Sequence, residues 1–216
     1  MSSVDAELKK KEKMQTIIKT DPAIKYESYE DLFRMPVTIV VTEFDDNAFH
    51  DFIEDMGEAQ TTGQPVVPII INSHGGCAYN CLGMLSAIEN SRIPVATIVM
   101  TKAQSAGSVL FAWGTDGYRY MDPNATLMLH DISDFVDDKL EDLKNEVRHL
   151  EFLNKNLYKR MSRRLGHEDN YFNDLIDKAR NVDLFLTSKE AKRHKIANFL
   201  RVPTLEVSVD VNYKFG

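Results

Sequence analysis

Short apolar segments rich in β-branched residues alternate with amphipathic segments along most of this chain, and this alternation limits the possible folds more than any other feature. The segments 36–41, 65–71 and 95–100 have the length and composition of strands. Between them, apolar residues recur at helical spacing, at Phe49, Phe52, Ile53 and Met56 and again at Leu82, Leu85, Ala87 and Ile88. Strands that alternate with helices pair in parallel through right-handed crossovers. The sequence therefore predicts a layered α/β domain built on a parallel sheet.

The same pattern divides the chain into three parts. Residues 1–30 are polar, charged and weakly periodic, so we expect an N-terminal arm outside the core. Residues 31–200 carry the predicted strands and helices, including two further short strands at 117–120 and 125–129, and we expect them to form one domain. Residues 201–216 are predicted to form a C-terminal strand or tail.

One predicted helix is unusually long. Apolar side chains follow spacings of three and four residues at Leu140, Leu143, Val147, Leu150, Leu153, Leu157, Met161 and Leu165. Such a helix either lies along its own domain or projects as an arm that packs against another subunit. The periodicity is compatible with both arrangements.

Composition excludes several classes of function. The formal net charge is −7, whereas a protein that binds nucleic acid usually shows a basic face. The first residues contain no apolar stretch typical of a secretory signal, and no apolar run approaches the roughly 20 residues that cross a bilayer. We therefore expect a cytoplasmic protein that binds neither nucleic acid nor membrane.

Ser105, His130 and Asp183 occur in settings that suit a catalytic triad. Ser105 lies among small residues between an apolar strand and an apolar helix, although a serine at this place is also a common helix N-cap. His130 closes the apolar segment 125–130, and Asp183 directly precedes the apolar segment 184–188. A serine nucleophile needs a base and a group that orients the base. The three residues are predicted to fill these roles.

Backbone amides for an oxyanion hole are predicted beside Ser105. The segment 71–76 (Ile-Asn-Ser-His-Gly-Gly) follows one predicted strand, and Ser105 follows the next. Loops at the carboxyl ends of neighbouring parallel strands lie side by side. The amides of Gly76 and Ala106 are then the expected donors to a developing negative charge.

Two other groups compete for roles in this site. His74 lies in the glycine loop and could contact substrate or face solvent. Lys102 stands three residues before Ser105 and raises the alternative of a Ser-Lys dyad, but on a loop at the sheet edge we expect it to remain charged. The acidic residues Asp131, Asp134, Asp137 and Asp138 compete with Asp183 as partners of His130, and we interpret them as a solvated loop.

The sequence resembles the proteolytic subunit of Clp protease, the ClpP family of serine peptidases, between about residues 35 and 198. The resemblance is carried by the stretches 71–76, 100–107, 122–130 and 183–191, which occur in the family's order. It assigns the triad to Ser105, His130 and Asp183 and the oxyanion amides to Gly76 and Ala106. The chain differs from the family at His74, where the family usually has proline, and in the acidic segment 131–138. It is therefore expected to be a divergent member.

The resemblance also implies an architecture. It implies a crotonase-like α/β fold with a protruding handle, here at about 131–165, and homo-oligomeric heptameric rings that can stack into a tetradecamer. The expected substrate-binding positions are Gly75, Asp131, Ile132 and Ser133. The resemblance implies protein or peptide substrates and a Clp-type AAA+ ATPase as the unfoldase partner. No Gly-x-x-x-x-Gly-Lys-[Ser/Thr] motif occurs in the sequence, so any ATP hydrolysis would belong to that partner.

The sequence thus predicts a serine endopeptidase that needs no metal or organic cofactor. Two alternatives stay open. One is a catalytically inactive ring subunit that scaffolds an active paralogue, and the other is a crotonase-type acyl-CoA enzyme, which shares the oxyanion amides but uses carboxylates as acid and base. The cytoplasm is the expected location, with a phage-encoded or organellar form as further options.

Overall fold

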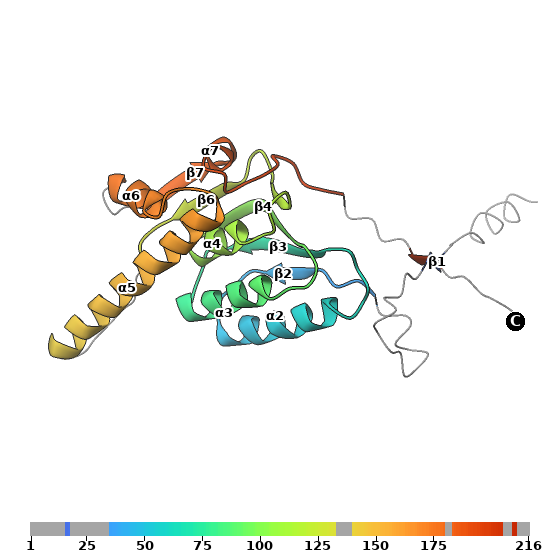
Figure 1. The fold of residues 1–216 in the computed structure, drawn as a ribbon, viewed down its shortest axis with the longest axis horizontal. Helices are drawn as coiled ribbons and strands as arrows, with labels where there is room; N and C mark the ends of the chain where they lie inside the picture. The colour runs from blue at the N-terminus through green and yellow to red at the C-terminus, as the bar shows by residue number, and fades with distance from the viewer. Residues whose placement is uncertain (1–15, 18–34, 133–139, 180–182, 205–208, 211–216) are drawn as a thin grey trace, which may run out of the picture.

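The chain forms a mixed α/β domain built on one main sheet (Figure 1). The computed structural model describes residues 16–17, 35–132, 140–179, 183–204 and 209–210. Within these residues the main sheet consists of β2 (Ile39–Val41), β3 (Val67–Ser73), β4 (Val95–Gln104), β5 (Arg119–Met121), β6 (Thr126–Leu129) and β7 (Leu184–Thr187). The strand order is β2-β3-β4-β6-β7, with β5 also paired to β4, and only the β6–β7 pair is antiparallel. The predicted α/β fold with a mostly parallel sheet is confirmed.

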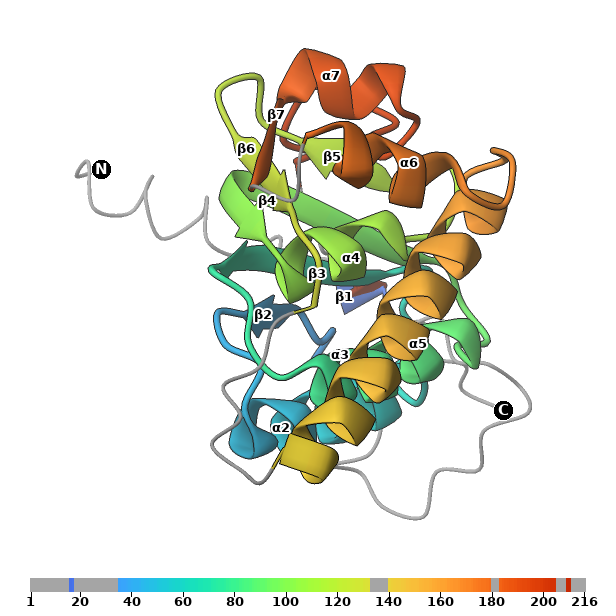
Figure 2. The same cartoon turned by 90° about the vertical axis from the view of Figure 1, so that its left-hand side faces the viewer.

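Six helices cover this sheet in the described part of the chain. They are α2 (Asp46–Ala59), α3 (Ala78–Glu89), α4 (Ala106–Ala112), α5 (Leu140–Arg164), α6 (Tyr171–Lys178) and α7 (Ser188–Arg193). Helices α2 and α3 lie beside β2 and β3, and α6 and α7 lie at the β7 end of the sheet (Figures 1 and 2). The core between the layers includes Ile69, Val99, Phe111 and Trp113, all fully buried. The described helices include none that is long and apolar enough to span a membrane.

The ends of the chain contribute a second, very small sheet. β1 (Thr16–Ile17) pairs in parallel with β8 (Val209–Asp210). These strands belong to the segments predicted as an N-terminal arm and a C-terminal strand or tail.

β3 and β4 extend further than the sequence predicted. The apolar runs stop at residues 71 and 100, but pairing continues to Ser73 and Gln104. Ser73 pairs with Ala103, and Gln104 pairs with Met128 on the other side. Small and polar residues continue the ladder because main-chain hydrogen bonds do not depend on apolar side chains. As a result, Ser105 follows the last strand residue directly.

Helix α5 lies on its own domain over one half and projects from it over the other. Its C-terminal half packs on the domain, where Leu157, Met161 and Leu165 at its end are buried. Further toward its N-terminus, Val147 and Phe152 are 46% and 64% exposed. Figure 1 shows that this half projects beyond the sheet and the other helices. The predicted protruding handle helix is therefore present.

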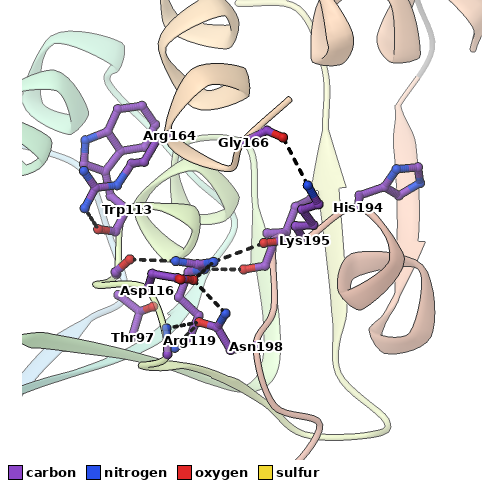
Figure 3. Close-up of polar contacts among 12 residues, drawn as sticks. Thr97, Trp113, Asp116, Arg119, Arg164, Gly166, His194, Lys195 and Asn198 are labelled. Atoms are coloured by element: carbon purple, nitrogen blue, oxygen red, sulfur yellow. Dashed lines mark hydrogen bonds and ion pairs between the residues drawn. The ribbon is translucent and has the colours of Figure 1, made fainter. Parts of the chain in front are cut away.

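A buried arginine ties the strand β5 to the chain that follows α7 (Figure 3). Arg119 is 3% exposed, and its guanidinium donates to the carbonyl oxygens of Ile196 (2.8 Å), Gly114 (3.1 Å) and Lys195 (3.2 Å). It also donates to Asp116 Oδ1 at 3.0 Å. Burial lowers the pKa of Arg119, and the Asp116 carboxylate opposes this shift. One cation thus satisfies a main-chain oxygen of the preceding loop and two of the chain that follows α7.

We predict that Arg119→Met destabilises the fold by at least ~2 kcal/mol, because each buried carbonyl left without a donor costs about 1–3 kcal/mol. Urea unfolding followed by circular dichroism measures this change. Arg163→Met is the matched control, because Arg163 is 61% exposed and bonds Asp169 at the surface, where ion pairs contribute little. Equal unfolding midpoints for the two variants would contradict the role assigned to Arg119.

Candidate active site

Ser105 occupies a strained turn between β4 and α4. Its backbone has φ 51° and ψ −122°, a conformation that residues with a side chain rarely adopt. Strain of this kind costs about 1–3 kcal/mol and persists only where the surroundings enforce it. Here the Ser105 amide donates to Met128 O at 2.8 Å, and its carbonyl accepts from the amides of Ser108 and Val109. The turn places the half-buried Ser105 at the carboxyl end of β4.

His130 contacts this hydroxyl directly. Its Nε2 lies 2.7 Å from Ser105 Oγ. The contact follows from the parallel pairing of β4 with β6, because Gln104 pairs with Met128 and both chains leave the sheet at the same edge. The structure therefore brings the predicted nucleophile and the predicted base into hydrogen-bond distance.

Asp183 directly precedes β7, and His130 directly follows β6. The two strands run antiparallel and their last pair is Leu129 opposite Leu184, so both residues lie at the same end of this pair. Asp183 is exposed, and within the described residues it makes no hydrogen bond to His130. The antiparallel pair thus brings the predicted third member to the end of the sheet where His130 lies, without a bond between the two side chains.

The two amides predicted for an oxyanion hole flank Ser105. Gly75 and Gly76 both have positive φ, at 103° and 152°. A Cβ built on Gly75 would stand 2.6 Å from Ser105 Cβ, so the glycine loop packs directly on the nucleophile. In the part of the chain that the structure describes, the amides of Gly76 and Ala106 donate to no protein acceptor, whereas the Gly75 amide donates to Ser73 Oγ at 3.0 Å. Both predicted amides are left available for a ligand.

Asp131 and Ile132, predicted to bind substrate, are held by helix α5. Asn154 Nδ2 donates to Asp131 Oδ1 at 2.6 Å, and the Ile132 amide donates to Asn154 Oδ1 at 3.1 Å. Ser133, the fourth predicted position, lies outside the described residues. The sequence analysis missed Asn154 and the neighbouring Tyr158. Their signal was a pair of polar groups four residues apart on the apolar side of a helix.

His74 and Lys102 interact with each other instead of with Ser105. Lys102 Nζ donates to His74 Nε2, and His74 Nδ1 lies 2.9 Å from Gln104 Oε1. In this arrangement the imidazole accepts from the ammonium and donates to the amide oxygen. The base that touches Ser105 is therefore His130, and His74 and Lys102 pair with each other.

One group of potential metal ligands occurs elsewhere, on α2. Donor atoms of His50, Asp51 and Glu54 lie within 4.8 Å of one another, and all three side chains are exposed. Exposed carboxylates often gather in this way without a metal. Helix α2 supplies none of the predicted site residues, so this group has no evident part in the chemistry at Ser105.

We predict that Gly75→Ala slows the reaction of Ser105 with a fluorophosphonate probe by about 100-fold or more, the scale expected when a reacting group shifts by about 1 Å. The new methyl group would need the space of Ser105 Cβ. Gly57→Ala in α2 is the control, because nothing lies within 4 Å of its added Cβ, and its probe reaction should match wild type. A wild-type rate in Gly75→Ala would refute the close packing.

Comparison with known proteins identifies the family of this chain. A family model described as Clp protease matches residues 20–199, a range that includes Ser105, His130 and Asp183. The ATP-dependent Clp protease proteolytic subunit 1 of Salinibacter ruber (strain DSM 13855 / M31) is 29% identical over 141 residues, which make up 65% of this chain and 58% of that protein. The match therefore spans less than two thirds of the relative's own length. Because the family model covers most of the sequence, the chain belongs to the Clp protease family.

Proposed function

We propose that this protein is a serine endopeptidase that cleaves unfolded polypeptides or peptides. The observation that carries the proposal is the 2.7 Å contact between Ser105 Oγ and His130 Nε2, made by a serine in a strained strand-to-helix turn. A serine that served only as an N-cap would bond a helix amide, but the Ser105 side chain makes no such bond. Membership in the Clp protease family supports a peptidase.

The reaction follows from the placement of these groups. His130 Nε2 accepts the hydroxyl proton as Ser105 Oγ attacks the scissile carbonyl, and His130 then protonates the leaving amine. Water hydrolyses the acyl-enzyme in the second half of the reaction. The free amides of Gly76 and Ala106 stabilise the oxyanion in both halves. We assign Asp183 as the acceptor of the His130 Nδ1–H. A carboxylate in this role fixes the imidazole tautomer and stabilises the imidazolium.

The substrate is proposed to bind as an extended strand. Gly75 lies on one side of Ser105, and Asp131 and Ile132 follow His130 on the other. A peptide that pairs with main-chain groups at such an edge gains affinity without requiring a particular sequence. This mode of binding suits an enzyme that accepts many unfolded chains.

The assembly is proposed to be a homo-oligomeric ring, as a heptamer or a stacked tetradecamer, that encloses the active sites. The exposed Val147 and Phe152 on the projecting half of α5 suit a contact between subunits. The Salinibacter ruber relative is named as ATP-dependent, which supports a Clp-type AAA+ unfoldase as the partner. Such a partner would deliver chains already unfolded.

A scaffold role within a ring is the second candidate. The observation that favours it is the exposed Asp183, which makes no hydrogen bond to His130 among the described residues. A subunit whose third triad member stays apart would keep the fold and the ring but lose most of the activity. The reactivity of Ser105 separates the two candidates.

We expect a fluorophosphonate probe to label wild-type protein once per chain and to leave Ser105→Ala unlabelled. Native mass spectrometry of the same samples gives the ring size and shows whether the variant assembles like wild type. If large rings form but do not label, the scaffold role would be favoured over the peptidase role. Labelling that survives Ser105→Ala would mean that another residue is the nucleophile.

Asp183→Asn should lower kcat for a fluorogenic peptide by up to about 10⁴-fold, because an amide cannot stabilise the imidazolium and favours the wrong tautomer. Lys102→Ala is the contrasting variant, since Lys102 contacts His74 and not Ser105, and its kcat should stay within about tenfold of wild type. Full activity in Asp183→Asn with complete loss in Lys102→Ala would reverse these roles and favour a Ser-Lys dyad.

A further inference from the structure

Helix α5 holds three consecutive residues at the predicted base. Tyr158 Oη donates to the carbonyl oxygen of His130 at 2.7 Å. One turn earlier on the same helix, Asn154 binds both the Asp131 carboxylate and the Ile132 amide. His130, Asp131 and Ile132 are thus fixed by two side chains spaced four residues apart, which places both on one face of α5.

The tyrosine bond is made in a dry environment. Tyr158 is 2% exposed and sits in the helix between Leu157 and Met161, both also buried. Burial raises the pKa of the Tyr158 hydroxyl, and the Asp131 carboxylate raises it further, so the hydroxyl stays protonated and acts as a donor. A buried hydroxyl without an acceptor would lose roughly 1–3 kcal/mol, which keeps it on the His130 carbonyl.

The position of the His130 backbone decides where its ring lies. β6 ends at Leu129, so His130 has already left the sheet ladder, and its side chain must still reach Ser105 Oγ at 2.7 Å. The pairing of Met128 with Gln104 fixes the chain up to the strand end. Beyond it, the hydrogen bonds with Tyr158 and Asn154 hold these residues, together with the packing of Ile132 against the core.

We infer that Tyr158 is a positioning residue for the catalytic base, with Asn154 supporting the residues that follow. Among the described residues, the Tyr158 hydroxyl bonds the His130 carbonyl and not the Ser105 side chain, so we infer that it acts on the base through the His130 backbone. The reactivity of Ser105 therefore depends on the seating of α5 against the domain. The inference rests on the proposed peptidase function.

Tyr158→Phe tests the inference, because it removes one oxygen atom and keeps the ring in the core. We expect the rate of fluorophosphonate labelling to fall about tenfold or more, while labelling still reaches one probe per chain. For a fluorogenic peptide, kcat should fall with little change in KM, since the peptide does not contact Tyr158. A purely structural defect would instead lower the labelled fraction and leave the rate of the remaining molecules unchanged.

Tyr171→Phe is the matched control. It also deletes a tyrosine hydroxyl that makes a 2.7 Å contact, here to His194 Nδ1, on a helix that supplies no predicted site residue. Its labelling rate should equal that of wild type. Asn154→Ala should show a smaller loss than Tyr158→Phe, because it leaves the His130 carbonyl bonded.

The outcomes distinguish a failure of the positioning role of Tyr158 from a failure of the proposed peptidase function. If wild type labels at Ser105 and Tyr158→Phe labels within twofold of its rate, the positioning role is wrong and the peptidase stands. A similar loss in Tyr171→Phe would also overturn the inference, because it would show a general effect of losing a hydrogen-bonded tyrosine hydroxyl. If wild type does not label, the proposed function and the inference fail together.

Discussion

The site depends on the parallel pairing of β4 with β6. This pairing sends Ser105 and His130 out of the sheet at the same edge, and it ties the Ser105 amide to Met128 O. Neither residue could find the other through local structure, because they are 25 positions apart in the sequence. The sheet topology therefore brings the nucleophile and the base together, and the helices around them adjust their geometry.

The edge of the sheet also stores strain. Ser105 keeps a positive φ because Gly75 packs against its Cβ, and because hydrogen bonds fix its amide and its carbonyl. In the described part of the chain, the amides of Gly76 and Ala106 beside this turn donate to no protein acceptor. Strain, close glycine packing and unsatisfied amides together are expected at a site that stabilises a developing negative charge.

Much of this arrangement could be predicted from the sequence. The β-branched runs predicted the parallel sheet, and the order of motifs predicted which residues would meet at its edge. The ends of β3 and β4 were predicted too early, because apolar periodicity does not register polar residues that continue a ladder. The roles of Asn154 and Tyr158 were missed, since two polar groups four residues apart on a helix do not reveal which distant groups they bond. The contact of Lys102 with His74 could not be predicted, because it depends on the register between β3 and β4.

Reaction with a peptide chloromethyl ketone tests the central claim most directly, since such a reagent needs both an activated serine and an adjacent imidazole. Tandem mass spectrometry of the digested protein identifies the alkylated atom. The account predicts alkylation of His130, and its loss in Ser105→Ala. Alkylation at His74 or Cys77 instead, or alkylation of His130 that persists without Ser105, would contradict a working pair of Ser105 and His130.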